Sequence, residues 1–177
     1  MKMLMRSKNL KIKFVEESDA QFILDLRNNK ELGKYLSSTS SSLENQKEWI
    51  NNYKKREKNG EEYYFKAYND NSDIGFFRLY NIDNTKKELT FGSFIMKVDR
   101  PKYAAIESMI LAMEFAFKTL NMDKVLLDVR INNERAKNFY NRFGFIKINE
   151  DEIDEFYELT KENYKVLFEE KYKEFLW

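Results

Sequence analysis

Apolar residues recur three or four positions apart in several stretches of the chain, which is the spacing of amphipathic helices. These stretches are residues 18–29, 43–58, 103–120, 133–143 and 161–176. Ser18-x-x-Gln21 and Ser41-x-x-Glu44 have the spacing of capping boxes, so the first two helices are predicted to begin there.

Other stretches alternate apolar and polar residues or are rich in aromatic and β-branched residues, which predicts β-strands. They are residues 10–15, 62–68, 74–80, 88–96, 124–129, 145–148 and 155–159. In chain order, a strand and two helices precede a meander of three strands, after which helices and strands alternate. This order predicts an α/β protein in which a mixed sheet carries helices on both faces.

The composition is that of an ordinary soluble globular domain, with 42% hydrophobic and 34% charged residues. A length of 177 residues without a compositional break predicts one domain over residues 1–177. The net charge of +1 gives no overall attraction for nucleic acid or an anionic membrane. No run of eighteen apolar residues is present, and residues 1–8 lack a signal-peptide pattern, so a cytoplasmic protein is expected.

The chain contains no cysteine and no histidine. This excludes disulfides, thiol nucleophiles, Ser-His or Cys-His catalysis, and thiolate or imidazole metal sites, so no metal is expected. Any acid–base chemistry must use Asp, Glu, Tyr, Lys, a chain terminus or water.

The turn 100–105 joins a predicted strand to a predicted helix and carries Arg100 and Lys102. Backbone N–H groups at a helix N-terminus attract anions, and the small Ala104 and Ala105 allow an anion to approach the backbone. The turn therefore suits a pyrophosphate group. An ordinary helix start with basic neighbours explains the same residues, and the local sequence alone favours that interpretation.

Tyr140 shares the apolar face of the predicted helix 133–143 with Ala136, Phe139 and Phe143. In one interpretation it is a core tyrosine whose hydroxyl reaches the surface. In the other it is a general acid whose hydroxyl points into a cleft at a strand end. Spacing alone favours the core, because most aromatic residues in such positions are buried for packing.

Taken together, these residues resemble the GNAT superfamily of acyl-CoA N-acyltransferases. The family's loop pattern Q/R-x-x-G-x-G/A, which holds the pyrophosphate of coenzyme A, corresponds to Arg100-x-x-Tyr103-x-Ala105, with Tyr103 where the family usually has Gly. A later family signature corresponds to Asn133-x-x-Ala136-x-x-Phe139-Tyr140-x-x-x-Gly144-Phe145. The resemblance covers about residues 10–160 and leaves a C-terminal helix of about 161–176 beyond it.

The resemblance implies a central, mostly antiparallel sheet that splays apart between its fourth and fifth strands and binds acetyl-CoA there. The residues it implies for acetyl-CoA binding are Ile95, Met96, Lys97, Arg100, Lys102, Tyr103, Ala104, Ala105, Asn133, Ala136, Phe139 and Tyr140. No metal is implied.

The N-terminal part resembles the branch that contains ribosomal-protein N-terminal acetyltransferases, spermidine acetyltransferases and acetyltransferases of nucleotide-linked amino sugars. The residues that carry this resemblance lie in 25–28, 34–36 and 44–50. It implies that Arg27, Asn28 and Trp49 lie on the acceptor side. For Trp49, a role as the core anchor of the second helix is an equal alternative.

The implied reaction is direct transfer of an acetyl group to a primary amine, with Tyr140 protonating the departing thiolate. Because the chain has no histidine, the base must be a carboxylate or a water chain. Glu88 and Asp128 are the candidate carboxylates, although either could instead be an ordinary surface or paired group. The expected acceptor is a small molecule, with an amino sugar, nucleotide-linked or free, favoured over a polyamine.

Two alternatives remain open from the sequence. One is a protein N-terminal acetyltransferase, and the other is a CoA-binding or interaction protein that has lost catalysis, for which Tyr103 in the loop is the main support. The aromatic stripe of the C-terminal helix would pack either on its own domain or on a second copy in a homodimer.

Overall fold

The computed structural model describes residues 4–35 and 42–176. It contains one eight-stranded sheet in the order β1-β2-β3-β4-β5-β6-β8-β7. The strands are β1 (Met5–Arg6), β2 (Lys11–Phe14), β3 (Tyr63–Tyr68), β4 (Asp73–Asp83), β5 (Glu88–Met96), β6 (Lys124–Arg130), β7 (Ile146–Glu150) and β8 (Asp154–Thr160). The helices are α1 (Ala20–Asn28), α2 (Leu43–Lys58), α3 (Ala104–Glu114), α4 (Glu134–Phe143) and α5 (Lys161–Leu167). In the described parts of the chain, no helix has both the length and the apolar character needed to cross a membrane.

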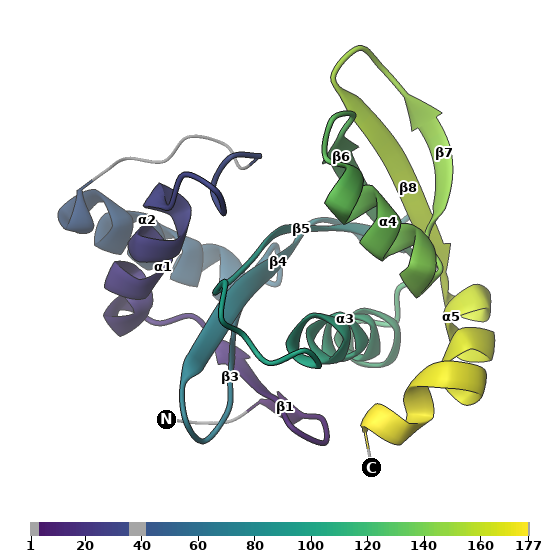
Figure 1. Ribbon diagram of the computed structural model, residues 1–177, viewed down its shortest axis with the longest axis horizontal. Coiled ribbons are helices and arrows are strands. Elements are labelled where there is room, and N and C mark those ends of the chain that lie inside the picture. Colours follow the sequence, from purple (N-terminus) through teal and green to yellow (C-terminus); the bar gives the residue numbers. More distant parts are fainter. Residues whose placement is uncertain (1–3, 36–41, 177) are drawn as a thin grey trace.

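The sheet is antiparallel except between β5 and β6. Parallel pairing joins Glu88–Thr90 to Lys124–Leu126, and beyond it the two strands diverge (Figure 1). This confirms the predicted mixed sheet that opens between the fourth and fifth predicted strands, which are β5 and β6. The numbering differs because β1, only two residues long, is too short to show a periodic pattern and was not predicted.

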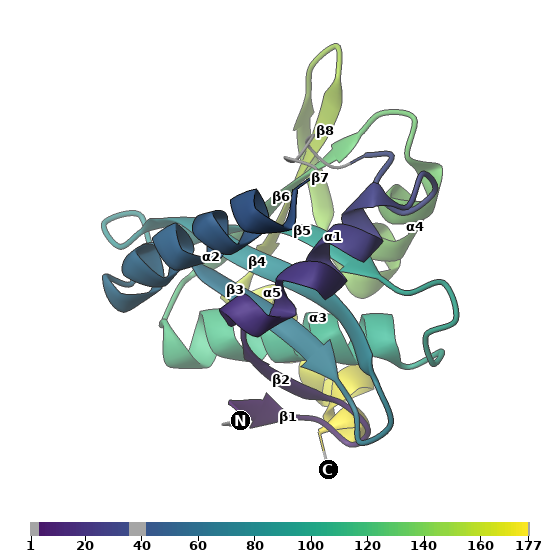
Figure 2. The ribbon, with the colours of Figure 1, turned by 90° about the vertical axis from the view of Figure 1, so that its left-hand side faces the viewer.

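Helices cover both faces of the sheet (Figure 2). Alternation along the strands divides the core, because successive side chains point to opposite faces. Tyr64 and Phe76 pack with α1 and α2, whereas their neighbours Phe65 and Phe77 join the larger cluster around α3. The sheet therefore has a packed hydrophobic layer on each face.

The start of α1 differs from the sequence prediction. A 3-10 turn, Glu17–Asp19, precedes the helix, and the reciprocal capping box is formed by Glu16 and Asp19, with the Glu16 N–H donating to Asp19 Oδ2 at 2.9 Å. The predicted box at Ser18-x-x-Gln21 was therefore wrong, because the extra turn shifts the cap. Ser41 lies outside the described residues. The observed cap of α2 is Ser42, whose side chain accepts from the Asn45 N–H at 3.1 Å.

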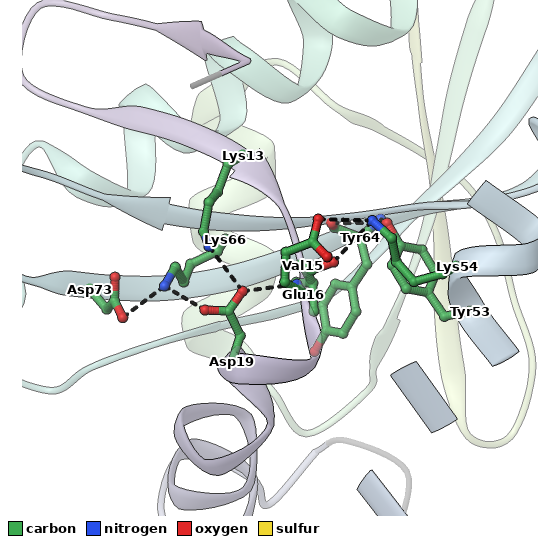
Figure 3. A network of polar contacts seen from close by, with 9 residues as sticks. All are labelled: Lys13, Val15, Glu16, Asp19, Tyr53, Lys54, Tyr64, Lys66 and Asp73. Carbon is green, nitrogen blue, oxygen red and sulfur yellow. Dashed lines mark hydrogen bonds and ion pairs between the residues drawn. The ribbon is translucent and has the colours of Figure 1, made fainter. Parts of the chain in front are cut away.

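Asp19 also anchors this helix start to the sheet through a buried ion-pair network (Figure 3). Lys66 Nζ lies 2.5 Å from Asp19 Oδ1 and 2.9 Å from Asp73 Oδ2, and Lys13 Nζ lies 3.3 Å from Asp19 Oδ2. Burial alone would lower the pKa of Lys66, but hydrogen bonds to Asp19 and Asp73 raise it above its ordinary value. The network holds the start of α1 at a fixed place on the sheet.

Replacing Lys13 by Met is expected to destabilise the protein by about 1–3 kcal/mol, because Asp19 stays buried and loses one of its two cations. Lys11→Met on the same strand is the control, since Lys11 pairs with the exposed Asp70 and such surface pairs contribute about 0–1 kcal/mol. Urea unfolding measures both variants. Equal losses of stability would contradict a structural role for the buried network.

The C-terminal helix packs on its own domain. The ring of Tyr172 stacks on Phe143 with centroids 4.8 Å apart, and its hydroxyl donates to the Phe143 carbonyl at 3.0 Å. Tyr164 Oη lies 3.1 Å from Glu114 Oε1. The aromatic side chains of the C-terminal helix, Tyr164, Phe168 and Tyr172, therefore pack into the main hydrophobic core beside α3 and α4.

Candidate functional site

A cleft of about 230 Å³ lies between the end of β5 and α4, where β5 and β6 have diverged. It is lined by Glu31, Leu32, Tyr35, Phe94, Ile95, Met96, Arg100, Ala105, Asn133, Arg135, Ala136, Phe139 and Tyr140. The structure thus brings together predicted residues from three separate segments: the end of β5, the turn before α3, and α4.

The motif in α4 has a local structural reason at each end. Asn133 caps the helix, with its Oδ1 accepting from the Ala136 N–H at 3.2 Å, and both residues line the cleft. Gly144 ends it with φ of 117°, a left-handed conformation that favours glycine. A Cβ at this glycine would also lie 2.2 Å from Leu167 Cδ1. The Asn and the Gly therefore set the length and position of the helix that carries Tyr140.

Two arginines meet at the mouth of the cleft. Arg100 donates from Nη1 to the Lys97 carbonyl at 3.0 Å, and Arg135 projects from the first turn of α4. Burial, and then the charge of Arg135, lower the pKa of Arg100. Like charges in this arrangement, beside the first turn of α3, suit an anionic ligand such as a pyrophosphate group.

Sequence reasoning missed Arg135 and the segment after α1. Glu31, Leu32 and Tyr35 line the cleft from the side of that segment, and Tyr35 Oη donates to the Asn132 carbonyl at 3.2 Å. The segment thus reaches across to the loop before α4. An arginine two residues after the helix cap was the available signal for Arg135. Residues 34–36 were noted only for their resemblance to a family branch, and nothing local pointed to residues 31–33.

Four predicted cofactor residues do not line the cleft. Lys102 is exposed, Ala104 is buried in the core, and Lys97 Nζ lies 5.3 Å from the ring centroid of Phe22. Tyr103 turns away, and its Oη accepts from Asn69 Nδ2 at 3.0 Å. Its backbone has φ of −71°, which any residue adopts. The tyrosine at the usual glycine position therefore leaves the cleft open.

Tyr140 is buried and lines the cleft. Its ring makes edge contacts with Phe91, Phe139 and Phe145 at centroid distances of 6.3, 5.4 and 5.9 Å. Burial, followed by the negative charge of Asp128, raises the pKa of its hydroxyl. Tyr140 consequently stays protonated at neutral pH and can act as a proton donor. Tyr140 thus packs in the core and also lines the cleft, and its role as a general acid stays a prediction.

Asp128 lies on β6, two residues beyond the last residue that pairs with β5. It is exposed at this opening, yet the partial burial of its carboxyl group raises its pKa, the charge of Asp154 adds to the increase, and Arg130 opposes it. Asp128 also raises the pKa of Tyr80, after burial. Asp128 therefore interacts electrostatically with both Tyr80 and Tyr140.

Glu88 lies at the opposite end of β5 from the cleft. Met96 is eight positions further along the strand, which corresponds to about 26 Å. It lies in the paired part of the sheet, 3.7 Å from Lys86 Nζ. This placement does not support the prediction of Glu88 as a base.

The predicted acceptor-side residues lie on α1 and α2, which cover the face of the sheet opposite α3 (Figure 2). Asn28 is exposed at the end of α1, and Arg27 is half-buried. Trp49 stacks on Tyr53 at 6.0 Å, and the guanidinium of Arg78 lies 5.1 Å from its ring centroid. Trp49 is therefore a packed, half-buried residue, and Arg78 is a neighbour that sequence reasoning missed.

Comparison with known proteins gives consistent results. A family model described as an acetyltransferase (GNAT) domain matches residues 9–146. The apo structure of FdhC, a nucleotide-linked sugar GNAT, shares 37% identity with a TM-score of 0.90 over 100% of both chains. The spermidine N-acetyltransferase from Vibrio cholerae in complex with CoA and spermine shares 22% identity, with a TM-score of 0.75 over 89% of this chain and 98% of that chain, a likeness of fold alone. No curated protein sequence matches significantly.

Proposed function

The chain belongs to the GNAT family of acetyltransferases, and we propose that it moves the acetyl group of acetyl-CoA to a primary amine of a small molecule. The observation that carries this proposal is the cleft where β5 and β6 diverge, since Arg100, Asn133 and Tyr140 converge on it from different segments. The arginine pair and the helix N-termini fit a pyrophosphate at one end. The phenol of Tyr140 fits the reacting thioester at the other.

In the proposed mechanism, Asp128 accepts a proton from the acceptor amine, directly or through water. The amine nitrogen then attacks the thioester carbonyl carbon, while a backbone N–H near the end of β5 stabilises the oxyanion. The carbon–sulfur bond breaks as the amide forms, and Tyr140 donates its proton to the departing thiolate. No covalent enzyme intermediate is needed, which agrees with a chain that has no cysteine.

For the acceptor, we propose an amino sugar, and in particular a nucleotide-linked one. FdhC, a nucleotide-linked sugar GNAT, matches this chain over its full length, and this match supports the proposal more strongly than the polyamine enzymes do, because those are similar only in fold.

A thiol-release assay tests the proposal with acetyl-CoA and a panel of amines: nucleotide-linked amino sugars, free amino sugars, spermidine and peptides with free N-termini. Release of CoA with an amino sugar is expected. Release with peptides alone would identify a protein N-terminal acetyltransferase. Calorimetric binding of acetyl-CoA without release for any amine would identify a binding protein that lacks catalysis.

The pH dependence of kcat/KM is expected to move in opposite directions in two variants near Asp128. Asp154→Asn removes a negative charge that raises the pKa of Asp128, so that pKa falls and the acidic limb moves to lower pH. Arg130→Gln removes a positive charge that lowers this pKa, so the limb moves to higher pH. The enzyme is active at pH values above this limb, because the base must be deprotonated to accept a proton. A limb that stays in place in both variants belongs to the amine and would argue against Asp128.

A further inference from the structure

Positive charge gathers on the sheet face that carries α1 and α2. Arg56 comes from α2 and Arg78 from β4, and both bind the buried carboxylate of Glu62. Arg56 Nε lies 2.9 Å from Glu62 Oε2, and Arg78 Nε and Nη2 lie 2.7 and 2.6 Å from Oε1. One carboxylate neutralises only one of the two guanidinium charges that it binds.

Aromatic rings fix the orientation of Arg78. Its guanidinium carbon lies 5.1 Å from the ring centroid of Trp49, 5.8 Å from that of Tyr64 and 5.0 Å from that of Tyr80. Its side chain is 22% exposed. A guanidinium held this way loses little freedom when it binds a ligand.

A third arginine lies close to this pair. Arg27 from α1 hydrogen-bonds the hydroxyl of Tyr64, and its pKa is lowered by burial and also by the nearby charge of Arg78, against the opposing effect of Tyr64. Partly buried like charges repel each other, and an anion between them would remove that repulsion. A cation in the same place would add to it.

This charge lies next to the proposed chemistry. Tyr80 is two residues from Arg78 on the same face of β4, and its hydroxyl extends over Gly92 of β5, where a Cβ would lie 2.8 Å from it. A larger residue at position 92 would push the ring of Tyr80 away from its present place. On the far side is Asp128, whose charge is felt by Tyr80. Tyr80 therefore contacts Arg78 and also interacts with the charge of Asp128, the proposed base.

We propose that Arg78 and Arg27 bind a phosphate or diphosphate group of the acceptor and so select an anionic amine over a polyamine. Glu62 and Arg56 position Arg78, while Trp49 and Tyr80 flank the bound group. This inference rests on the proposed function, because it names the part of the acceptor that this face binds.

A binding measurement tests the inference without requiring turnover. Inorganic pyrophosphate is titrated by calorimetry into protein saturated with CoA, so that the Arg100 end of the cleft is already filled. The affinity is expected to fall roughly tenfold or more in Arg78→Gln. Arg27→Gln, which leaves Glu62 fully paired, is expected to weaken binding in the same direction. Lys55→Gln removes a charge from the exposed side of α2 and should keep the affinity of the unaltered protein.

Kinetics with matched acceptors separates this inference from the proposed function. In Arg78→Gln, KM for a nucleoside-diphosphate-linked amino sugar is expected to rise roughly ten- to hundredfold while kcat is kept. KM for the free amino sugar should stay unchanged. Equal effects on both acceptors, or pyrophosphate binding that neither arginine variant alters, would overturn the inference and leave acetyl transfer intact. If no amine is acetylated, the proposed function fails, and the pyrophosphate titration still decides whether the anion site exists.

Discussion

Tyr140→Phe is expected to lower kcat by roughly 10²–10³-fold while acetyl-CoA binding persists, the range typical of losing one general acid. The substitution removes the hydroxyl and keeps the ring, so the edge contacts with Phe91, Phe139 and Phe145 remain. Because the proton is donated only as the thiolate departs, kcat and kcat/KM should fall together. Steady-state kinetics with calorimetric titration of acetyl-CoA measures both properties.

Tyr63→Phe is the matched control for this experiment. Tyr63 packs against Phe14 and Phe115 on the α3 side of the sheet, and it does not line the cleft. Its replacement should leave kcat at the level of the unaltered enzyme. Unchanged turnover in Tyr140→Phe would remove Tyr140 from the mechanism, and an equal loss in both variants would indicate a general effect on folding.

Asp128→Asn is expected to lower kcat/KM by roughly 10²-fold near neutral pH, because the amide cannot accept the amine's proton. The loss should shrink at high pH, where more of the amine is already deprotonated. Glu88→Gln discriminates between the two predicted bases and should keep normal activity, since Glu88 lies at the paired end of β5. A large loss in Glu88→Gln together with a normal Asp128→Asn would reverse the assignment.

The regular elements could be predicted because their residues carry a clear period. β5 was predicted with its observed bounds, Glu88–Met96, and α4 follows from its Asn cap and terminal Gly. The start of α1 could not be predicted, because a short 3-10 turn moves the cap to Glu16 and Asp19. Such turns depend on tertiary packing, here the buried pair between Asp19 and Lys66.

The cleft could be predicted only in part. Arg100, Asn133 and Tyr140 stand in family-like motifs and do line it. Tyr103 does not, since a sequence pattern says nothing about the direction of a side chain, and this one bonds Asn69 outside the cleft.

The face that carries α1 and α2, which we propose binds the acceptor, was the least predictable part of the chain. Arg78 lies in the predicted strand 74–80, and nothing in that stretch marks it as a functional residue. Only the fold places it beside Trp49, 29 positions earlier in the sequence, and against the buried Glu62. Long-range contacts of this kind leave no local signal.

The decisive experiment is the release of CoA from acetyl-CoA in the presence of a nucleotide-linked amino sugar, with the product identified by mass spectrometry. Our account predicts one acetylated amine for each CoA released, with both substrates bound before any product leaves and no acetylated enzyme formed. Binding of acetyl-CoA without release for any amine in the panel, or an acetyl group found on the protein as an intermediate, would contradict direct transfer by this chain.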